Sequence, residues 1–393
     1  MTSLAVALIC VLAQTPEEVQ LVDAGVVAEE TTLLAPSVES KPAEAPPVVV
    51  PWYQRVSIGG FARVQLGYTF PFRDEALVGG QGGFRVADFR LNLDFRPVER
   101  LTLYTSVELA APLVAPEDPL TGRRIVELRD AYIQYDVCSG LLIRAGQFRP
   151  SYDAEMLVGD GSLPFTNRSV LAGGLAPPEG YGPRQALAPD RQIGLQLGSK
   201  RLGSDTLGVK YAVGLFNGAG PNVLFNDNNG LMPVARVELD VMKRVTLGLN
   251  ASYNVRSEGV RPNRLYTSSV NYGLDVEAHV AFKQDHELSA MGVLLARSTS
   301  FSFAGLPAES ALGGMVQIRY LHQPSGLEAA LRNAYYEPSS GQVSDEVNEL
   351  TAMIGWRPFH LPFRVLAQYT SHSEASAVGY ANDSVDVMLH AVW

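Results

Sequence analysis

Basic side chains that could hold an anion recur along the chain, within segments where polar and apolar residues alternate. In such a segment every second side chain points to the same side. By this rule the polar side carries Arg63, Arg90, Arg144, Lys210, Arg236, Arg256, Arg319, Arg332 and Arg364. A guanidinium binds an oxyanion through two donors and stays charged, so a ring of arginines would lower the cost of dehydrating an anion.

Acidic residues lie on the same polar side and oppose this chemistry. They are Asp88, Asp94, Glu108, Asp130, Asp136, Glu238, Asp240, Asp275, Glu277, Glu328, Glu349 and Asp386. Mixed charges across a wide opening give a transverse field and mild selectivity, and close pairs neutralise one another. The residues therefore predict that anions contact this polar side, but they do not determine how strongly anions are preferred over cations.

The six histidines do not form a recognisable catalytic set. His279 and His390 fall on the polar side, but no nucleophile motif stands beside any histidine. No paired metal-ligand spacing or phosphate-cradling glycine loop is present, and GGQGG at 79–83 is typical of a loop. We expect no cofactor, no metal and no enzymatic activity.

The elements that must position these charges are β-strands. In SSVNYGLDVEAHVAF, for example, Val270, Tyr272 and Leu274 alternate with Asn271 and Asp275. Sixteen such segments are predicted, at 53–70, 84–95, 100–110, 125–137, 141–149, 190–199, 206–216, 234–241, 244–256, 267–282, 286–299, 311–323, 326–337, 347–357, 362–373 and 383–393.

The connections between these strands alternate between short turns and long loops. The even-numbered connections are short (RPVE, CSG, RLGSD, MK, KQD, PS, PFHL), and the odd-numbered ones run from about ten to forty residues. This asymmetry is typical of an outer-membrane barrel with periplasmic turns and extracellular loops. The predicted fold is an all-β transmembrane antiparallel barrel of about sixteen strands.

Composition agrees with a barrel. Charged residues make up 18% of the chain and apolar residues 46%, yet no run of eighteen apolar residues could span a bilayer as a helix. Aromatic residues gather near both strand ends, as at two membrane interfaces. A soluble sandwich, propeller or solenoid is the alternative, but it would not explain a polar, often charged face on every strand.

Two segments precede the barrel. The apolar run LAVALICVLA predicts a signal peptide over residues 1–13, although its start carries no Lys or Arg. Residues 14–51 follow as an acidic, proline-rich leader, expected to be disordered in the periplasm because it has too little apolar surface to bury. The barrel itself is expected over 52–393.

The last strand and the third long loop complete the expected architecture. The chain ends on SVDVMLHAVW, and in a closed barrel this strand would pair with the first so that no backbone edge faces lipid. Residues 150–189 form the longest loop, and twelve of its forty residues are Gly or Pro. Such a loop can reach into the lumen and narrow it; a surface loop is the alternative.

Successive motifs resemble a known family. LRDAYIQYDV, LLIRAGQFRPSYDAEML, PFTNRSVL, PDRQIGLQL, VKYAVGLFNGAG and PVARVEL resemble signatures of the phosphate-selective porins O and P, between Leu128 and about Leu239. The resemblance implies a trimeric channel whose third loop folds inward. It also places Arg144, Arg168 and Arg191 on basic positions of the family pattern, although strand parity alone would turn Arg191 outward.

Together these observations predict an outer-membrane porin of a Gram-negative bacterium, with a water-filled channel for passive diffusion of small solutes. The finer expectation is a preference for anions such as phosphate; a general diffusion porin without that preference is the alternative. A structural or adhesive barrel with a closed pore is a third, and an outer-membrane barrel enzyme, such as a phospholipase or protease, is the less favoured alternative. Expected partners are membrane lipid, small anions and two further copies of the chain, and no basic patch indicates nucleic acid.

Overall fold

The computed structural model describes thirteen stretches of the chain. These are residues 51–70, 82–115, 118–173, 186–220, 222–223, 225–226, 228–258, 264–282, 285–302, 307–341, 345–358, 361–374 and 382–393. The predicted signal peptide and nearly all of the predicted leader lie outside the described residues and stay predictions.

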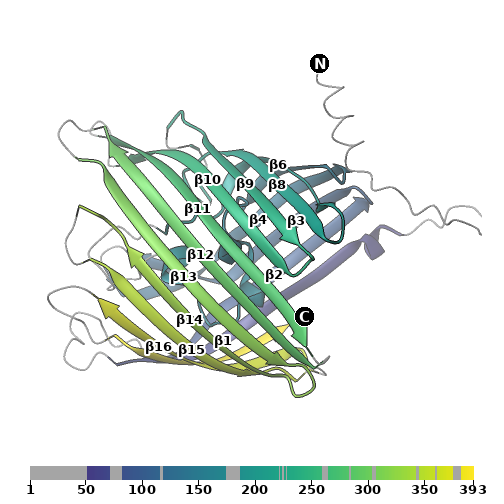
Figure 1. Cartoon of the computed structure of the whole chain (residues 1–393), viewed down its shortest axis with the longest axis vertical. Helices are drawn as coiled ribbons and strands as arrows, with labels where there is room; N and C mark the ends of the chain where they lie inside the picture. The colour runs from purple at the N-terminus through teal and green to yellow at the C-terminus, as the bar shows by residue number, and fades with distance from the viewer. Residues whose placement is uncertain are drawn as a thin grey trace, which may run out of the picture.

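The described chain is almost entirely β-structure (Figure 1). Its long strands are β1 (Val56–Thr69), β2 (Gly83–Val98), β3 (Leu101–Ala115), β4 (Asp118–Cys138), β5 (Leu141–Phe148), β6 (Gln192–Gly198), β8 (Leu207–Phe216), β9 (Met232–Val241), β10 (Val245–Glu258), β11 (Leu265–Phe282), β12 (His286–Phe301), β13 (Glu309–His322), β14 (Leu327–Glu337), β15 (Val347–Trp356), β16 (Phe363–Glu374) and β17 (Ser384–Val392). The two-residue β7 (Leu202–Gly203) extends the β6 position along β8, so the wall has sixteen strand positions.

The sheet closes on itself. Each strand pairs antiparallel with its neighbour in sequence, and β1 pairs with β2 on one side and with β17 on the other. The closing register sets Ala62 opposite Ala391 and Arg63 opposite His390. The predicted pairing of the last strand with the first is therefore confirmed, as is the sixteen-stranded barrel.

One expected loop is a strand hairpin instead. The segment between 110 and 125 was predicted as a loop, but β3 continues to Ala115 and β4 begins at Asp118, with Pro112 opposite Arg124. The pairing of β2 with β3 is recorded only as far as Glu108, so the outer part of β3 has one partner strand. A proline is tolerated at such an edge because its missing N–H can face away from the ladder.

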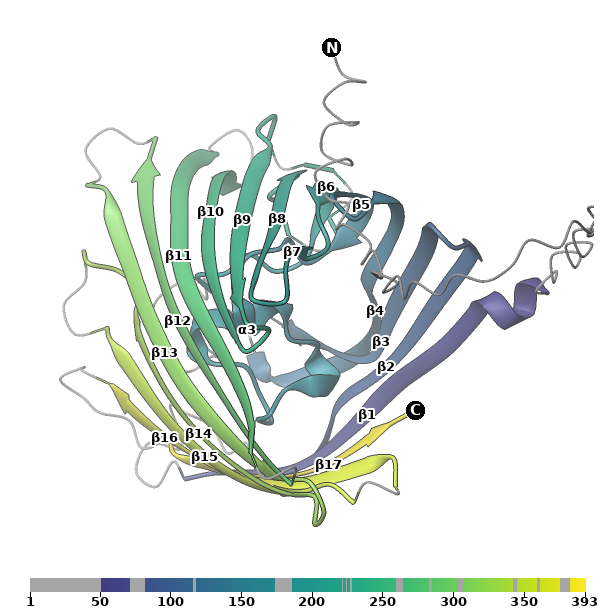
Figure 2. The ribbon, with the colours of Figure 1, turned by 45° about the vertical axis from the view of Figure 1, so that its right-hand side comes forward.

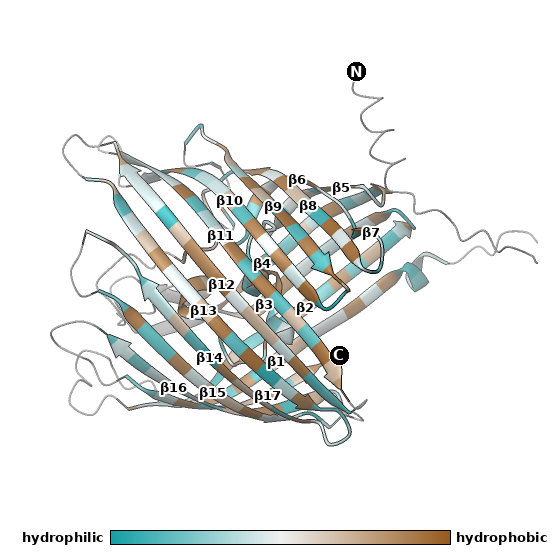
Figure 3. Cartoon of the chain, viewed as in Figure 1, coloured by the Kyte–Doolittle hydropathy of each residue, from teal (hydrophilic) through white to brown (hydrophobic). Residues whose placement is uncertain are grey.

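Side-chain burial is the reverse of that in a water-soluble protein. Figure 3 shows hydrophobic and hydrophilic residues alternating along the strands. The apolar side chains point outward, where Val316 is 67% exposed and Ile354 is 68% exposed, whereas inward-pointing Arg332 and Thr351 are 1% and 0% exposed. The polar face lines the interior, as the sequence pattern predicted.

A connection between β5 and β6 fills part of this interior. It contains α3 (Ala154–Leu157), the 3-10 turn η2 (Asp160–Ser162) and α4 (Val170–Gly173), and Figure 2 shows α3 inside the ring of strands. A further 3-10 turn, η1 (Trp52–Arg55), precedes β1. The predicted inward-folded third loop is confirmed for its described residues, 150–173 and 186–189. We call these residues the inserted loop.

Candidate functional site

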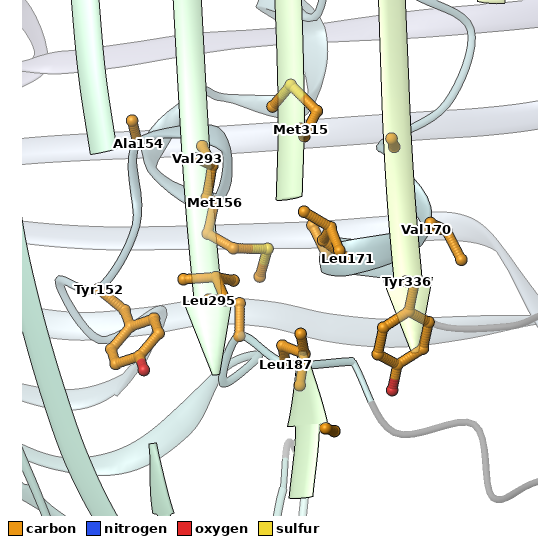
Figure 4. Close-up of a cluster of buried hydrophobic side chains, with 14 of the residues drawn as sticks. Tyr152, Ala154, Met156, Val170, Leu171, Leu187, Val293, Leu295, Met315 and Tyr336 are labelled. Carbon is orange, nitrogen blue, oxygen red and sulfur yellow. The ribbon is translucent and has the colours of Figure 1, made fainter. Parts of the chain in front are cut away.

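An apolar patch on the barrel wall holds the inserted loop in place (Figure 4). Loop residues Tyr152, Met156 and Leu171 are at most 3% exposed, and they cluster with inward-pointing Leu295 of β12 and Met315 of β13. Burying these side chains drives the loop onto the wall, since each Leu or Met side chain contributes about 1.5–3 kcal/mol on full burial. The expectation of a polar inner face was wrong for 291–295 of β12 and 311–315 of β13, which the loop covers. Farther along the same strands, Arg297 and Arg319 keep the polar pattern.

Phe165 forms a second apolar anchor farther along the loop. It is 2% exposed and clusters with Met353, Leu366 and Met388 of the neighbouring wall. The guanidinium carbon of Arg332 lies 4.5 Å from the centre of the Phe165 ring, which adds a cation–π contact. The loop is thus packed against two separate regions of the lumen.

Wall arginines also hold the backbone of the loop. Nη1 of Arg364 donates to the carbonyl of Leu163 (2.7 Å), and its Nη2 donates to the carbonyl of Pro164 (2.7 Å). Nη1 of Arg332 donates to the carbonyl of Asn167 at 3.0 Å. Carbonyls that the irregular loop cannot satisfy internally are therefore satisfied by the wall.

Four arginines converge on one carboxylate, that of Asp160 in η2. Asp160 Oδ1 accepts from Nη2 of Arg149 (2.9 Å) and from Nη2 of Arg168 (2.5 Å). Asp160 Oδ2 contacts Arg90 and lies 3.7 Å from Nη2 of Arg191. We call these five residues the Asp160 cluster; it connects the inserted loop to β2 and to the residues that flank β5 and β6.

The Asp160 carboxylate is ionised at any ordinary pH. Burial alone would raise its pKa, but the guanidinium groups of Arg149, Arg168, Arg90 and Arg191 hold the pKa well below its usual value. The carboxylate therefore acts as a permanent counter-ion for the arginines around it, and the cluster presents less positive charge than its arginine content indicates.

Arg144 on β5 is held differently. Its Nε and Nη2 donate to Gln134 Oε1 at 3.0 and 2.7 Å, and its guanidinium carbon lies 4.5 Å from the centre of the Tyr132 ring and 5.3 Å from that of Phe148. Among the described residues, no carboxylate lies within 4.0 Å of it. The two aromatic rings and one amide orient the guanidinium without neutralising its charge.

Two cavities lie on either side of the inserted loop. The outer cavity, towards the long loops, has a volume of about 660 Å³, and the inner one, towards the short turns, has about 510 Å³. Arg149 and Met156 line both cavities and therefore lie between them. Arg144 lines the inner cavity and a smaller neighbouring one of about 180 Å³.

Most of the basic residues predicted to face the lumen do so within ion pairs. The pairs include Arg63 with Asp88, Arg90 with Glu108 and Asp160, Lys210 with Glu238, Arg236 with Asp275 and Glu238, Arg319 and Arg364 with Glu328, and Arg332 with Glu349. Of the predicted site residues that the structure describes, only Arg144 and Arg256 have no carboxylate within 4.0 Å. These two are the available cations of the predicted set.

Arg191 corrects the parity rule. Parity would turn it outward, but its side chain is 4% exposed, and its Nε and Nη2 donate to the two oxygens of Asp130 at 3.0 and 3.1 Å. It directly precedes β6, where the backbone has not yet taken up the alternation of the strand. The side chain of Arg191 is therefore turned towards Asp130, in contrast to the expectation from parity.

The sequence reasoning missed three residues of this region: Arg149, Asp160 and Arg297. Arg149 and Asp160 lie outside the strands, where alternation gives no signal. Arg297 lies on β12, whose weak alternation comes from apolar residues on both faces. Arg149 lies within the motif LLIRAGQFRPSYDAEML, which was the available clue for that residue.

The two histidines that were expected in the lumen lie apart. The His390 ring is buried and contacts Phe61 edge-on at 5.7 Å, and His279 is exposed near the short-turn end of β11. Within the described part of the chain, no group of three or more metal-ligating side chains is found. No described helix is long and apolar enough to cross a membrane.

Comparison with known proteins adds to this geometry. No family model matches the chain, and no curated protein matches it. Solved structures do: the outer-membrane channel DcaP of Acinetobacter baumannii (TM-score 0.57, 14% identity) covers 86% of this chain and 97% of its own. The anion-selective porin from Comamonas acidovorans (TM-score 0.57, 12% identity) covers 86% and 99%.

A trimer form of OmpT, an outer-membrane protein of Vibrio cholerae, matches with a TM-score of 0.53 and 11% identity over 86% of this chain and 99% of its own. These identities are too low to transfer activity. The resemblance to phosphate-selective porins stays a prediction, and what the comparisons establish is that this chain has the closed barrel fold of outer-membrane porins.

Proposed function

We propose that this protein is an outer-membrane porin that lets small solutes diffuse through a water-filled channel. The observation that carries the proposal is the reversed burial of the barrel, with apolar side chains outside and charged side chains inside. A closed ring of strands satisfies every backbone hydrogen bond within the wall, which a hydrocarbon surrounding requires. Sixteen strands enclose more space than inward side chains fill, so the interior holds water.

The path for a solute follows the two cavities. A solute enters the outer cavity, passes Arg149 and Met156 beside the inserted loop, and reaches the inner cavity beside Arg144. We call the narrow part beside Arg149 and Met156 the waist. The apolar patch and Phe165 hold the inserted loop in place and so fix the width of the waist. A fixed waist sets an upper size limit for what diffuses through.

A preference for small anions, with phosphate as the candidate, is the finer part of the proposal. It is supported by Arg144, which is oriented in the lumen and has no carboxylate partner among the described residues. The wall also carries many carboxylates, so the preference is expected to be modest. The fold likeness to the anion-selective porin from Comamonas acidovorans is consistent with this direction.

Assembly and location complete the proposal. A homotrimer in the outer membrane of a Gram-negative bacterium agrees with the resemblance and with the trimer form of OmpT. The segment 1–13 would direct export, and the acidic segment 14–51 would lie in the periplasm.

The test is conductance and zero-current potential of the purified protein in planar bilayers, under chloride and then phosphate gradients. The proposal predicts stable ohmic steps and a zero-current potential whose sign shows mild anion preference. Absence of conductance steps from a folded barrel would contradict the channel. A cation-preferring potential in both salts would leave the channel and remove the anion preference.

A further inference from the structure

Nine inward-pointing side chains of the outer cavity form a regular grid on β10, β11 and β12. The registers Ser252–Asn271–Arg297, Asn254–Ser269–Thr299 and Arg256–Thr267–Phe301 define its three rows. All nine side chains line the outer cavity. The grid is therefore one continuous surface, which we call the β10–β12 grid.

The two arginines stand at opposite corners of this grid. Two strand spacings and four residues along a strand separate them, about 16 Å between Cα atoms. No carboxylate lies within 4.0 Å of Arg256 or Arg297 in the described part of the chain. Nη1 of Arg297 is 3.4 Å from the carbonyl of Ala186. An acid group of a ligand can therefore pair with either guanidinium, in a cavity that Glu309 and Asp345 also line.

Neutral hydrogen-bonding groups occupy the area between the arginines. Asn271 Nδ2 donates to Ser252 Oγ at 3.1 Å, which fixes both side chains. The hydroxyls of Thr267, Ser269 and Thr299 make no hydrogen bond to another protein group within the described residues. Hydroxyls and amides of this kind both donate and accept, as a polyhydroxylated ligand requires.

Phe301 occupies a third corner of the grid. Its ring lines the outer cavity beside Thr267 and Thr299. The C–H face of a sugar ring is apolar and can cover an aromatic ring, which removes apolar area from water. An inorganic oxyanion would use the arginines but would leave the ring and the hydroxyls unused.

We infer that the β10–β12 grid binds a hydroxylated organic anion of the sugar-acid type, the size of a mono- or disaccharide. Its carboxylate pairs with Arg256, its hydroxyls bond to the central row, and a sugar face packs on Phe301. The cavity volume of about 660 Å³ is in the range of small-molecule sites. The site precedes the waist, so it would concentrate such solutes before they pass Arg149.

The test is isothermal titration of the full chain, folded in detergent, with glucuronate, glucose and inorganic phosphate. Glucuronate should bind more tightly than either other probe. Arg256→Gln should weaken glucuronate binding about tenfold, as the loss of a charge-assisted hydrogen bond implies, and should leave glucose nearly unchanged. Thr299→Val should weaken glucuronate but not phosphate, and the control Arg96→Gln, exposed near the β2–β3 turn, should change neither.

Phosphate binding as tight as glucuronate binding, with equal sensitivity to Arg256→Gln, would overturn the inference. Undetectable glucuronate binding by the folded barrel would overturn it as well. The inference rests on the proposed channel only for access to the cavity. Binding without bilayer conductance would contradict the channel and support the site, whereas conductance without binding would contradict the site alone.

Discussion

Asp160 Oδ1 on the inserted loop lies 2.9 Å from Nη2 of Arg149, the residue that directly follows β5. This ion pair joins the loop to the wall between the two cavities, both of which Arg149 lines. Arg90, Arg168 and Arg191 share the same carboxylate. Asp160 is therefore the counter-ion that limits the positive charge of the waist.

Asp160→Asn should raise the anion-over-cation permeability ratio by at least about twofold, because four guanidinium groups would lose a shared negative charge. Zero-current potentials in potassium chloride gradients measure the ratio. The control is Asp386→Asn, which removes a lumen carboxylate bonded to Gln65 (2.6 Å) and outside the Asp160 cluster. Equal shifts in the two variants would mean that the location of the charge is unimportant.

Arg144→Gln should lower the anion-over-cation ratio and weaken any phosphate block of the chloride current. Arg144 carries an unneutralised charge, whereas Arg319 is paired with Glu328 at 2.8 Å and shares it with Arg364. Arg319→Gln, the matched control, should therefore have the smaller effect on selectivity. A larger effect in Arg319→Gln would show that an ion-paired arginine still dominates the lumen potential.

Phe165→Ala should loosen the inserted loop without opening the barrel. Truncating a buried phenylalanine costs about 3–5 kcal/mol, and here the loss falls on the anchor of the loop. We expect higher single-channel conductance with more current noise, and faster proteolysis within 150–173. Leu157→Ala in the same loop is the control because Leu157 is 42% exposed. Unchanged conductance and proteolysis in Phe165→Ala would mean that other contacts suffice.

The packing of the inserted loop against the barrel wall, which we call loop closure, should depend on pH through Asp153, the N-cap of α3. Burial, together with neighbouring Glu155, raises the pKa of Asp153 to about 7, against an ordinary value of 3.8. In a loop released from the wall, the Asp153 carboxyl would lose its proton near the ordinary pKa of an aspartate. In the packed loop it keeps the proton up to a pH of about 7. Closure is therefore most favourable below the ordinary pKa and weakens as the pH rises through this window.

The measurement is current noise and loop proteolysis at pH 4 and pH 8 for the unchanged protein and for Asp153→Asn. Asn keeps the N-cap role but not the charge. At pH 4 the variant should show the same current noise and loop proteolysis as the unchanged protein. At pH 8 it should show less of both, because its loop stays packed against the wall. A variant that behaves like the unchanged protein at both values would contradict the assigned titration.

Much of the fold could be predicted from sequence because two regular patterns determine it. One is the alternation of side chains along each strand, and the other is the alternation of short turns and long loops between strands. Alternation along a strand predicts which residues face inward, and it placed Arg63, Arg332 and Glu349 correctly. The predicted strand 286–299 has apolar residues on both faces, because Met291, Val293 and Leu295 point inward and are covered by the inserted loop. An apolar inner face beside a long loop can therefore be interpreted as the docking surface of that loop.

The site was harder to predict because its residues are brought together by tertiary structure. Asp160 meets Arg90 and Arg191 only after the loop has folded across the lumen, and no local pattern in the sequence reports such a contact. Partner charges were also hidden: Arg236 and Asp275 both face inward by parity, but only the structure shows that they pair at 2.6 Å. Counting lumen arginines therefore overstates the charge available to an anion.

The central claim is that lipid surrounds the barrel and water fills it, and two adjacent residues of β13 test it directly. Val316 points outward and Gln317 inward. Each is replaced by Cys, the protein is inserted into lipid vesicles, and labelling by a charged, water-soluble thiol reagent is compared with that of the unsubstituted protein. Gln317→Cys should react and reduce conductance, and Val316→Cys should not react. Labelling of Val316→Cys with a protected Gln317→Cys would contradict the account.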